Sequence, residues 1–499
     1  MKKKYYLSRI IRSLVSIVAI MIVVFTMVYS LVPRDNIFFN DTTFVKLAGK
    51  PDDKLDYQMR TWQKVGYLEY ETLANYCGSL YEAGSDKVTA CLLNDSKESK
   101  DFVQIYEEKG YDIGYLPVSK RPYASIEKPI LTRLLKWFSN ILVFDHPGKI
   151  QDDKNPNLER NISVGTTVSG GLAVKCSGCE HKYLLYTDTR FPFIHQNIIT
   201  LDLGTSYPSY NGLKVLDVVF NTQGAEDKRT VVYETGLPGE TGMIFGTLKY
   251  KSTLDKLEKN KFIDNYADGI VKKNTPSMVG VSFIMGIFAM VLAYGIGLPV
   301  GVLMAKNKDG IIDKLGMLYI IFIIAVPSLA YIYVFRFLGT NIFGLPSTFP
   351  TLGPSDIRSW VLPTISLALP SISSLMLWTR RYIVDQMNSD YVKFAKAKGM
   401  NENEIFWKHI FRNAIIPIAQ GIPSSLASCI TGAIITESIY SVGGMGKMLP
   451  DAINGYNNAV IIALTFIYSA VSIISTFLGD IVVTWVDPRI SLEEKEGRA

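Results

Sequence analysis

The sequence lacks the motif that binds nucleotide phosphates in P-loop ATPases. Its three Gly-Lys pairs begin at Gly49, Gly148 and Gly446, and none of them is followed by Ser or Thr. A P-loop needs that hydroxyl because it binds the magnesium ion of the nucleotide. We therefore expect no nucleotide at such a loop and no cofactor in this chain.

Cysteine and histidine are scarce as well, with five and four residues in a chain of 499. The run Cys176–His181 (CSGCEH) resembles half of a zinc site. A second pair of ligands at zinc spacing is missing, so free or bridged structural cysteines are favoured over a metal site. On an oxidising face, bridges between Cys77 and Cys91 and between Cys176 and Cys179 are possible.

What the chain does contain is long apolar runs. A helix of about 20 apolar residues crosses the hydrocarbon core, and a helix satisfies its own backbone groups there. The sequence therefore predicts an all-α polytopic membrane protein with six transmembrane helices. The six runs are Ile10–Leu31, Met278–Ala305, Leu315–Leu338, Val361–Trp378, Ile415–Ile435 and Ala459–Leu478.

These runs are poor in ionisable residues, whereas charges within a membrane normally mark ion or proton relays. Arg336, Glu437 and Asp480 lie near predicted span ends, and we interpret them as interfacial. This argues against an ion-coupled carrier. Within the second run, Gly295, Gly297 and Gly301 are expected to permit close helix packing rather than to contact a substrate. Pro327, Pro363 and Pro370 are expected to kink their spans.

The basic residues predict the orientation. They precede the first run and lie between the second and third and between the fourth and fifth, so both termini are expected in the cytoplasm. The net charge of +6 needs no nucleic-acid partner, since these residues sit at membrane edges. The first run is favoured as an uncleaved anchor over a signal peptide, because its core is long and no small-x-small site follows. The basic residues are Lys2, Lys3, Lys4, Arg9 and Arg12; Lys306, Lys308 and Lys314; and Arg380, Arg381, Lys393, Lys396, Lys398, Lys408 and Arg412.

Residues 32–276 lie between the first two runs and are therefore expected outside as a large domain. Tyr183–Phe191 and Thr230–Gly236 are typical of strands, and Phe102–Gly110 of a short helix closed by glycine. A mixed α/β extracytoplasmic domain is predicted. The expected organisation is 1–31 (N-terminus and first helix), 32–276, 277–486 (helices two to six, with a cytoplasmic loop at 382–412) and a cytoplasmic tail at 487–499.

The polar segment Asp390–Pro417 stands between two apolar runs. Its pattern predicts two short helices around Gly399, which ends the first one. Asn401 and Glu404 match an N-cap with a reciprocal acidic partner that starts the second helix. The residues alone leave open whether this loop lies on the membrane surface or binds another protein.

AKAKG (395–399) and RNAIIP (412–417) resemble the coupling loop of ABC importer permeases. DYVKFAKAKG (390–399) resembles the oligopeptide, dipeptide and nickel branch, whose Lys393 and Phe394 replace the Glu and Ala of the broader pattern. Further matches cover nearly all of Met278–Ser491, with Ile10–Leu31 and Leu201–Phe220. The outer loop is far larger than is usual, and this enlarged form resembles the first permease subunits of streptococcal Ami-type oligopeptide importers.

The resemblance implies a type I importer fold in a bacterial plasma membrane and a role as half of an oligopeptide pathway. It implies a second permease subunit, two cytoplasmic ATPases that bind ATP and magnesium, an extracytoplasmic peptide-binding lipoprotein and surrounding membrane lipid. The matched ATPase-coupling residues are Asp390, Tyr391, Ala395, Ala397, Lys398, Gly399, Glu404, Arg412, Asn413 and Pro417. Ser366, Ser371 and Ser374 suit a mildly polar pathway wall, although helix packing explains them equally well.

Other classes remain open. A dipeptide or nickel permease of the same branch is the nearest alternative, and nickel is disfavoured by the lack of a metal cluster. A membrane-anchored peptide receptor would need only one or two spans. A multi-span enzyme would need a nucleophile with a base, or a metal site, and the sequence shows neither. The outer domain is expected either to bind the lipoprotein or to serve as a stabilising cap.

Overall fold

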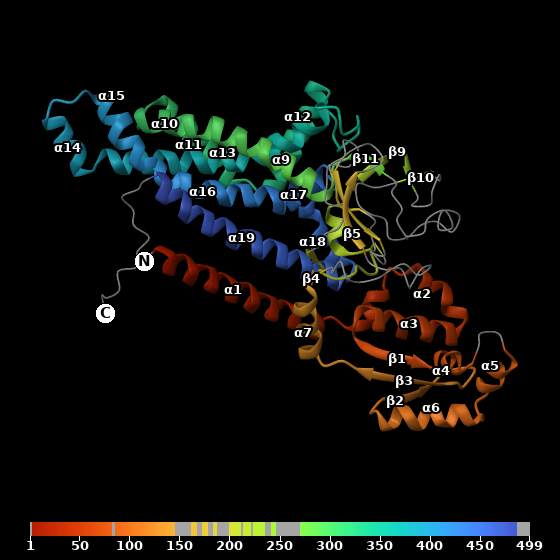
Figure 1. Cartoon of the computed structure of the whole chain (residues 1–499). Helices are drawn as coiled ribbons and strands as arrows, with labels where there is room; N and C mark the ends of the chain where they lie inside the picture. Colours follow the sequence, from red (N-terminus) through yellow and green to blue (C-terminus); the bar gives the residue numbers. More distant parts are fainter. Residues whose placement is uncertain are drawn as a thin grey trace.

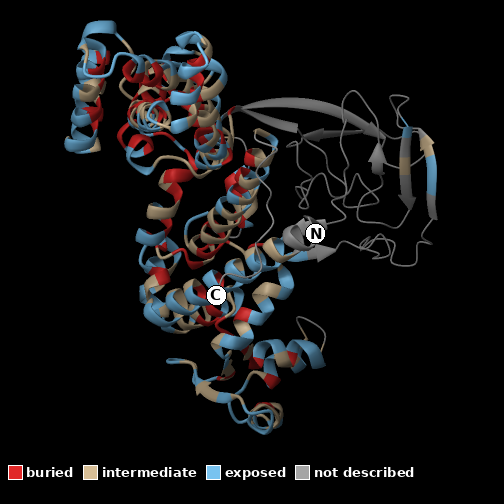
Figure 2. Ribbon diagram, turned by 90° about the vertical axis from the view of Figure 1, so that its left-hand side faces the viewer, coloured by how far each residue is buried: buried red, intermediate tan, exposed pale blue. Residues whose placement is uncertain are grey.

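The computed structural model describes residues 2–81, 85–144, 161–166, 172–177, 183–186, 199–210, 213–220, 223–234, 241–245 and 270–486. A bundle of long helices occupies one part of the molecule, and shorter helices and strands gather at one end of it (Figure 1). Buried residues concentrate where the helices of the bundle face one another, while many outward faces are exposed (Figure 2).

Five helical segments in the described ranges are long and apolar enough to cross a membrane. They match five of the six predicted runs, because each run is uninterrupted by more than two charges over a window of membrane length. In order they are α1 (Lys2–Leu31); α9 (Met278–Leu292) continued by the π-helical η3 (Ala293–Gly297) and α10 (Leu298–Lys306); α13 (Arg358–Met387); the segment around α16 (Arg412–Thr431); and α19 (Asn458–Val486).

The third predicted span is not one continuous helix, because the bend expected at Pro327 is a complete break. It is split into α11 (Ile311–Ala325) and α12 (Ser328–Phe343), whose axes meet at 112°. Pro327 stands at the break and Val326 adopts an extended conformation. A residue before proline is disfavoured in the α region, which explains why the first helix ends there. The pair counts as a sixth span only if the broken helix is taken as one.

Glycines bring the helices of the bundle close together. A Cβ on Gly286 of α9 would lie 2.5 Å from the Cβ of Cys429 in α16, and one on Gly301 of α10 would lie 2.7 Å from that of Thr379 in α13. Gly297 likewise approaches the backbone of α13, so a side chain at these positions would push the helices apart. Gly295 was predicted to do the same, but no atom lies within 4 Å of its missing side chain.

The first and last spans pack against each other, and α19 also packs against α16. An ion pair of 2.6 Å joins Arg9 near the start of α1 to Asp480 near the end of α19. These two helix ends therefore lie on the same side of the bundle (Figure 1).

The described residues between 32 and 275 include both helices and strands, and their assignment to one extracytoplasmic domain stays a prediction. A sheet of order β1-β3-β2 packs against α3, α4 and α6. The helix at Phe102–Gly110 is α6, and the two predicted strands correspond to β7 and β9 as far as the described residues reach. The helical elements are η1 (Arg34–Phe38), α2 (Thr42–Lys46), η2 (Leu47–Gly49), α3 (Pro51–Val65), α4 (Leu73–Leu80), α5 (Asp86–Cys91), α6 (Lys97–Glu108), α7 (Ile130–Asn140) and α8 (Val215–Phe220).

Within the described ranges, the strands form four antiparallel sheets. In the first, the register pairs Tyr70 of β1 with Ser125 of β3. The others have the orders β4-β8, β5-β6-β7 and β10-β9-β11. The strands are β1 (Leu68–Thr72), β2 (Asp112–Tyr115), β3 (Pro122–Glu127), β4 (Leu142–Phe144), β5 (Asn161–Thr166), β6 (Leu172–Ser177), β7 (Tyr183–Tyr186), β8 (Ile199–Leu201), β9 (Gln223–Glu234), β10 (Thr241–Phe245) and β11 (Ile270–Thr275).

Asp41 connects the start of this region to the segment that precedes α8. Its side chain caps α2 and accepts hydrogen bonds from the hydroxyls of Tyr57 and Tyr207. Burial alone would raise the pKa of Asp41, but these hydrogen bonds, with those from the backbone of Phe44 and Thr43, hold it below its usual value. The carboxylate is thus a charged anchor near neutral pH.

The same segment is fastened to the first turn of α19. The side chain of Asn457 accepts from the backbone of Tyr207 and donates to the carbonyl of Ser209. Asn458 donates to the hydroxyl of Tyr67 at 2.9 Å. These contacts tie the part that carries β1 to the membrane bundle through buried hydrogen bonds, which cost more to break than exposed ones.

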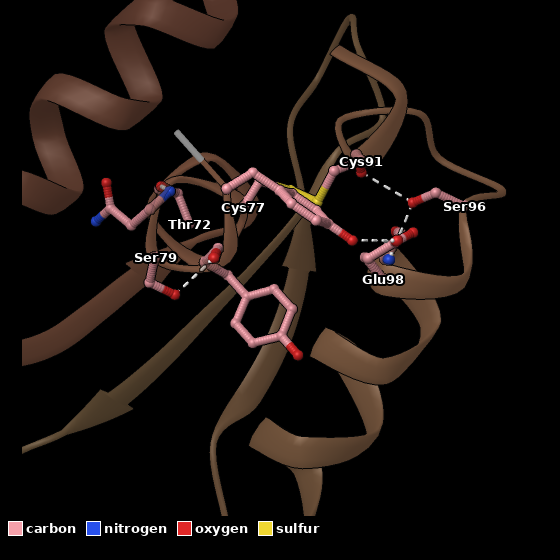
Figure 3. The surroundings of a disulfide bond; sticks show 10 residues. Thr72, Cys77, Ser79, Cys91, Ser96 and Glu98 are labelled. Atoms are coloured by element: carbon pink, nitrogen blue, oxygen red, sulfur yellow. Dashed lines mark hydrogen bonds between the residues drawn. A yellow bond between two sulfur atoms is a disulfide. The ribbon is translucent and has the colours of Figure 1, made fainter. Parts of the chain in front are cut away.

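A disulfide joins Cys77 in α4 to Cys91 in α5, one of the two bridges that the sequence left possible. Its surroundings are tied to the next helix, because the Ser96 hydroxyl that caps α6 also donates to the carbonyl of Cys91 (Figure 3). Both sulfurs lie in a buried cluster with Leu73 and Phe102. Cys179 and His181 lie outside the described residues.

Removing the bridge should loosen this corner. The Cys77→Ala/Cys91→Ala variant is expected to lose about 3 kcal/mol locally, because the open chain of 14-residue separation gains conformational freedom. Hydrogen exchange measured by mass spectrometry should accelerate by roughly a hundredfold in α4, α5 and α6. Amides of α3 are the internal control and should be unchanged. Equal exchange in both proteins would contradict a stabilising role for the bridge.

Candidate functional site

The end of the bundle opposite the strands carries α14 (Asp390–Ala397), the short helix at the start of the polar segment (Figure 1). Gly399 follows it with a φ of +78°, where its N–H donates to the carbonyl of Lys396. Glycine adopts this conformation without the strain that a Cβ brings, which explains why the helix ends here.

The next helix begins as expected but does not stay short. Asn401 caps α15 (Glu402–Ile405) by accepting from the backbone of Asn403. The predicted reciprocal bond from Glu404 is wrong, because that carboxylate pairs with Lys408 at 2.5 Å. The prediction of a second short helix is also wrong, because α15 continues through the π-helical η4 (Phe406–Phe411) directly into α16. The segment is therefore one separate helix followed by the extended start of a span.

A buried cluster holds this segment against the ends of two other spans. Val392 and Ala395 of α14 pack with Ile405, Phe406 and Ile410 of the following helix. The same cluster contains Val302 and Ala305 of α10, Ile383 of α13 and Ala414 of α16. Close-packed side chains transmit displacement with little compression. A push on α14 would therefore be felt by three membrane helices at once.

Lys306 strengthens this junction. Its ammonium, at the last residue of α10, lies 4.2 Å from the ring centre of Phe406 and 4.9 Å from that of Trp407. Cation–π contacts of this kind are worth about 0.5–1 kcal/mol at partly exposed sites. The residue was expected only to fix topology, and the aromatic pair 100 residues away gave no sequence signal for this contact.

Nearby, α11 is fastened to α13 by a bidentate ion pair. The guanidinium of Arg380 contacts both carboxylate oxygens of Asp313, at 2.5 and 2.7 Å. Asp313 also accepts from the backbone of Asp309, so the carboxylate is fully engaged. Two parallel N–H···O bonds fix direction as well as distance. Sequence reasoning counted Arg380 only as a topology residue and did not single out Asp313.

Two large apolar side chains are exposed among the charged and polar residues on the outward face of the segment. Phe394 is 69% exposed and Trp407 is 52% exposed. Of the residues matched to the coupling motif, Ala395 is buried and Tyr391 is half-buried, with its hydroxyl bonded to Gln386. The others lie at the surface or half-buried: Asp390, Ala397, Lys398, Gly399, Glu404, Arg412, Asn413 and Pro417. The matched residues thus form one continuous structural unit with an inner face and a free outer face.

Within the bundle, a cavity of about 500 Å³ opens between α9, α13 and α16. Ser371 and Ser374, three residues apart on α13, both line it. Ser366 does not, because its buried hydroxyl is hydrogen-bonded to that of Tyr440. The remaining polar lining consists of Ser282, Tyr294, Tyr382, Ser425, Ser428, Cys429, Thr436 and Glu437.

Glu437 lies near the end of the span Glu402–Ile439, and its side chain is enclosed by protein; an interfacial position stays a prediction. The residue belongs to α17 (Ile434–Ile439), is 3% exposed and lies at the wall of the cavity. Its carboxylate accepts hydrogen bonds from the hydroxyl of Ser282 and the backbone N–H groups of Ala433 and Lys447. It therefore fixes the turn between α16 and α18 (Met445–Asn454) against α9. Arg336 is likewise engaged with protein, since it donates to the carbonyl of Ile439.

The wall of this cavity is mildly polar. Its lining mixes hydroxyl groups with apolar side chains, and Glu437 is the one charged residue among those that line it. In the described part of the chain, no group of three or more histidine, cysteine or carboxylate side chains could hold a metal ion.

Comparison with known proteins gives a consistent result. Residues 297–492 match the family model described as "Binding-protein-dependent transport system inner membrane component". The chain is 38% identical over 502 aligned residues to the oligopeptide transport system permease protein AmiC of Streptococcus pneumoniae, which covers 99% of this chain and all of AmiC.

More distant relatives match less of the chain. The dipeptide transport system permease protein DppB of Bacillus subtilis is 34% identical over 217 residues, or 43% of this chain and 69% of DppB. An inward-facing structure of the MetNI methionine ABC transporter gives a TM-score of 0.34 at 15% identity, covering 42% of this chain and 94% of that one.

The cavity can be tested with cysteine accessibility. In a background with Cys176→Ser, Cys179→Ser and Cys429→Ala, single Ser371→Cys and Ser374→Cys variants should react with a small charged thiol reagent. Ser366→Cys and Ser373→Cys are the matched controls, because both side chains are buried on the same helix. We expect the first pair to react on the order of tenfold faster or more, since the reagent must reach the thiolate. Equal rates for all four would show that α13 presents another face to the cavity.

Proposed function

The chain belongs to the inner membrane permease components of binding-protein-dependent ABC importers, and from this premise we propose that it forms half of an oligopeptide uptake pathway. The assignment of oligopeptides as the substrate rests on how much of this chain each relative matches. AmiC matches this chain over its whole length, including residues 32–276, whereas the DppB proteins of Bacillus subtilis and Lactococcus lactis match 43% and 46% of it.

The cavity supports the pathway. It is bounded by α9, α13 and α16 of this one chain, and it carries hydroxyls and apolar groups. Its one charged lining residue, Glu437, is engaged by Ser282 and two backbone N–H groups. Peptides of varied sequence share a backbone that hydroxyl groups can bond, while their side chains differ. A second, homologous permease would supply the opposite wall, and the two would enclose the substrate.

The segment from Asp390 to Phe411 supports coupling to separate ATPases. The chain has no P-loop, so the energy of ATP must arrive from partner subunits. The exposed Phe394 and Trp407 offer an apolar contact surface, and the cluster beneath them leads to α10, α13 and α16. In this proposal, closure of two cytoplasmic ATPases moves α14, and the spans switch between inward and outward access.

The proposed orientation follows from charge and from sulfur chemistry. The end that carries α14 holds many of the basic residues and is assigned to the cytoplasm, with both termini. Residues 32–276 then form the extracytoplasmic domain, where the disulfide between Cys77 and Cys91 is favoured by the oxidising surroundings. This domain is assigned to the entrance of the pathway, where a peptide-binding lipoprotein delivers substrate.

Uptake by a deletion strain tests the substrate. Cells lacking this chain should lose most uptake of labelled tetra- to hexapeptides, and plasmid-borne expression should restore it. Excess unlabelled oligopeptide should compete, whereas dipeptide or nickel ions at the same concentration should not. Loss of dipeptide or nickel uptake with intact oligopeptide uptake would replace the proposed substrate with one of those alternatives.

Coupling is tested at Gly399. A Gly399→Val variant should cut peptide uptake by roughly fivefold to thirtyfold, because a branched side chain at φ +78° costs about 1–2 kcal/mol and disfavours the native turn. ATP hydrolysis by the purified complex should persist without matching transport. The readout is the ratio of peptide transported to ATP hydrolysed in vesicles.

Two substitutions serve as controls for that ratio. Gly399→Asn should retain most coupling, because asparagine tolerates the left-handed conformation. Gly344→Val places the same strain at a φ of +64° at the end of α12, away from the segment, and no atom crowds either glycine. A normal ratio in Gly399→Val, or an equal fall in Gly344→Val, would remove Gly399 from the coupling role.

A further inference from the structure

A second cavity, of about 580 Å³, lies at the opposite end of the bundle from α14. Phe25 and Tyr29 from the last turns of α1 line it, as do Ala459 and Ile462 from the first turns of α19. The other walls come from residues 63–69, from β3 with α7, and from the segment before α8. The cavity thus begins on membrane-spanning helices and ends on polar residues outside them.

The cavity carries an excess of positive charge. Its three carboxylates are all held by cations: Glu69 by Lys128 at 3.0 Å, Asp202 by Lys214 at 2.5 Å, and Glu127 by Arg34 at 2.5 Å. Three further basic residues also line it and have no carboxylate partner within the described ranges, namely Lys64, Arg133 and Lys136. The wall of this cavity therefore suits an anionic ligand, whose negative charge would balance these basic residues.

Of these three basic residues, Arg133 is the best placed to interact with an anion in the cavity. Its guanidinium lies between two aromatic rings, 3.8 Å from the centre of Tyr29 and 4.1 Å from that of Tyr67. Its buried Nη2 atom has no hydrogen-bond partner. A buried donor without a partner costs about 1–3 kcal/mol, and more when it is charged. Because Arg133 lines the cavity, an anion there would lie beside the guanidinium and offset part of this cost.

The helix that carries Arg133 has the form of a membrane-surface helix. On one face of α7, Leu134 packs with Met21 and Phe25 of α1 and with Ile462 of α19. On another face, Leu131 and Leu135, one turn apart, are 66% and 61% exposed. Figure 1 shows α7 beside the end of α1. An apolar face next to basic side chains at the end of a span is the pattern of a helix in the headgroup region.

We propose that this cavity is a binding site for an anionic phospholipid. The phosphate contacts Arg133, Lys64 and Lys136, and the acyl chains lie against α1 and the exposed leucines of α7. A lipid is favoured over a soluble anion because the apolar wall continues onto the spans. The bound lipid then joins α1, α19 and the adjoining domain into one unit at the membrane surface.

The test compares lipids of equal acyl chains on the full-length chain purified in detergent. Binding of phosphatidylglycerol and phosphatidylcholine is measured by native mass spectrometry. Wild type should bind phosphatidylglycerol on the order of a hundredfold more tightly, because three basic residues each contribute about a fivefold factor. In Lys64→Gln/Lys136→Gln this preference should fall by roughly 25-fold, since each basic residue near an anionic lipid contributes about a fivefold factor. Arg133 is left intact because its stacking on two tyrosines also supports the fold.

The matched control is Lys97→Gln/Lys100→Gln, which removes the same charge from α6 of the adjoining domain, outside the cavity. It should keep the wild-type preference. Leu131→Ser/Leu135→Ser changes no charge and should weaken both lipids. Sodium phosphate at constant ionic strength should not displace the lipid.

The proposal would be overturned if wild type bound the two lipids equally. It would also be overturned if the preference for phosphatidylglycerol fell equally in the control variant, or if free phosphate displaced the lipid. Loss of the lipid when the complete importer assembles would do the same, because it would assign the cavity to a protein partner. Each readout is lipid binding alone, so failure here leaves the transport proposal untouched.

Discussion

The lack of hydrogen-bonding partners in hydrocarbon shapes this chain more than any other constraint. Between Met278 and Val486 nearly all the backbone that could face lipid is helical. Where the helices break, protein side chains supply the missing bonds. Glu437 accepts from two backbone N–H groups around the turn after α16, and Arg336 donates to the carbonyl that ends α17. Glu437 and Arg336 thus form hydrogen bonds with backbone groups where the helices are interrupted. This role explains charged residues in spans without a proton or ion relay.

As a result, the two ends and the middle of the bundle have different structures. One end holds α14 in a buried cluster that reaches three spans, and the middle holds a cavity with a mildly polar wall. At the other end, Asn457 and Asn458 at the start of α19 are hydrogen-bonded to Tyr67, Tyr207 and Ser209 from the region between the first two spans. The buried cluster around α14 is tightly packed, whereas the cavity between α9, α13 and α16 is open.

Much of this plan was predictable from local sequence. Apolar length located five spans, and the glycine and asparagine of the polar segment located one helix end and one helix start. What could not be predicted was decided by distant contacts. Glu437 finds Ser282 across 155 residues, and no local pattern encodes that pairing. Ser366 and Ser371 are close in sequence, yet five residues rotate a helix by about 140°, so only one of them faces the cavity.

The pairing of α1 with α19 has a consequence for how the protein is made. Apart from α7, the chief partner of α1 is a helix that begins more than 400 residues later. At the usual pace of about 5–20 residues per second, α1 waits on the order of half a minute or more for it. During that time it must remain in the bilayer alone. The mean hydropathy of α1 is the highest of the candidate spans, and only a small share of its residues is buried inside the protein. Both properties suit a helix that must be stable in the bilayer without a packing partner.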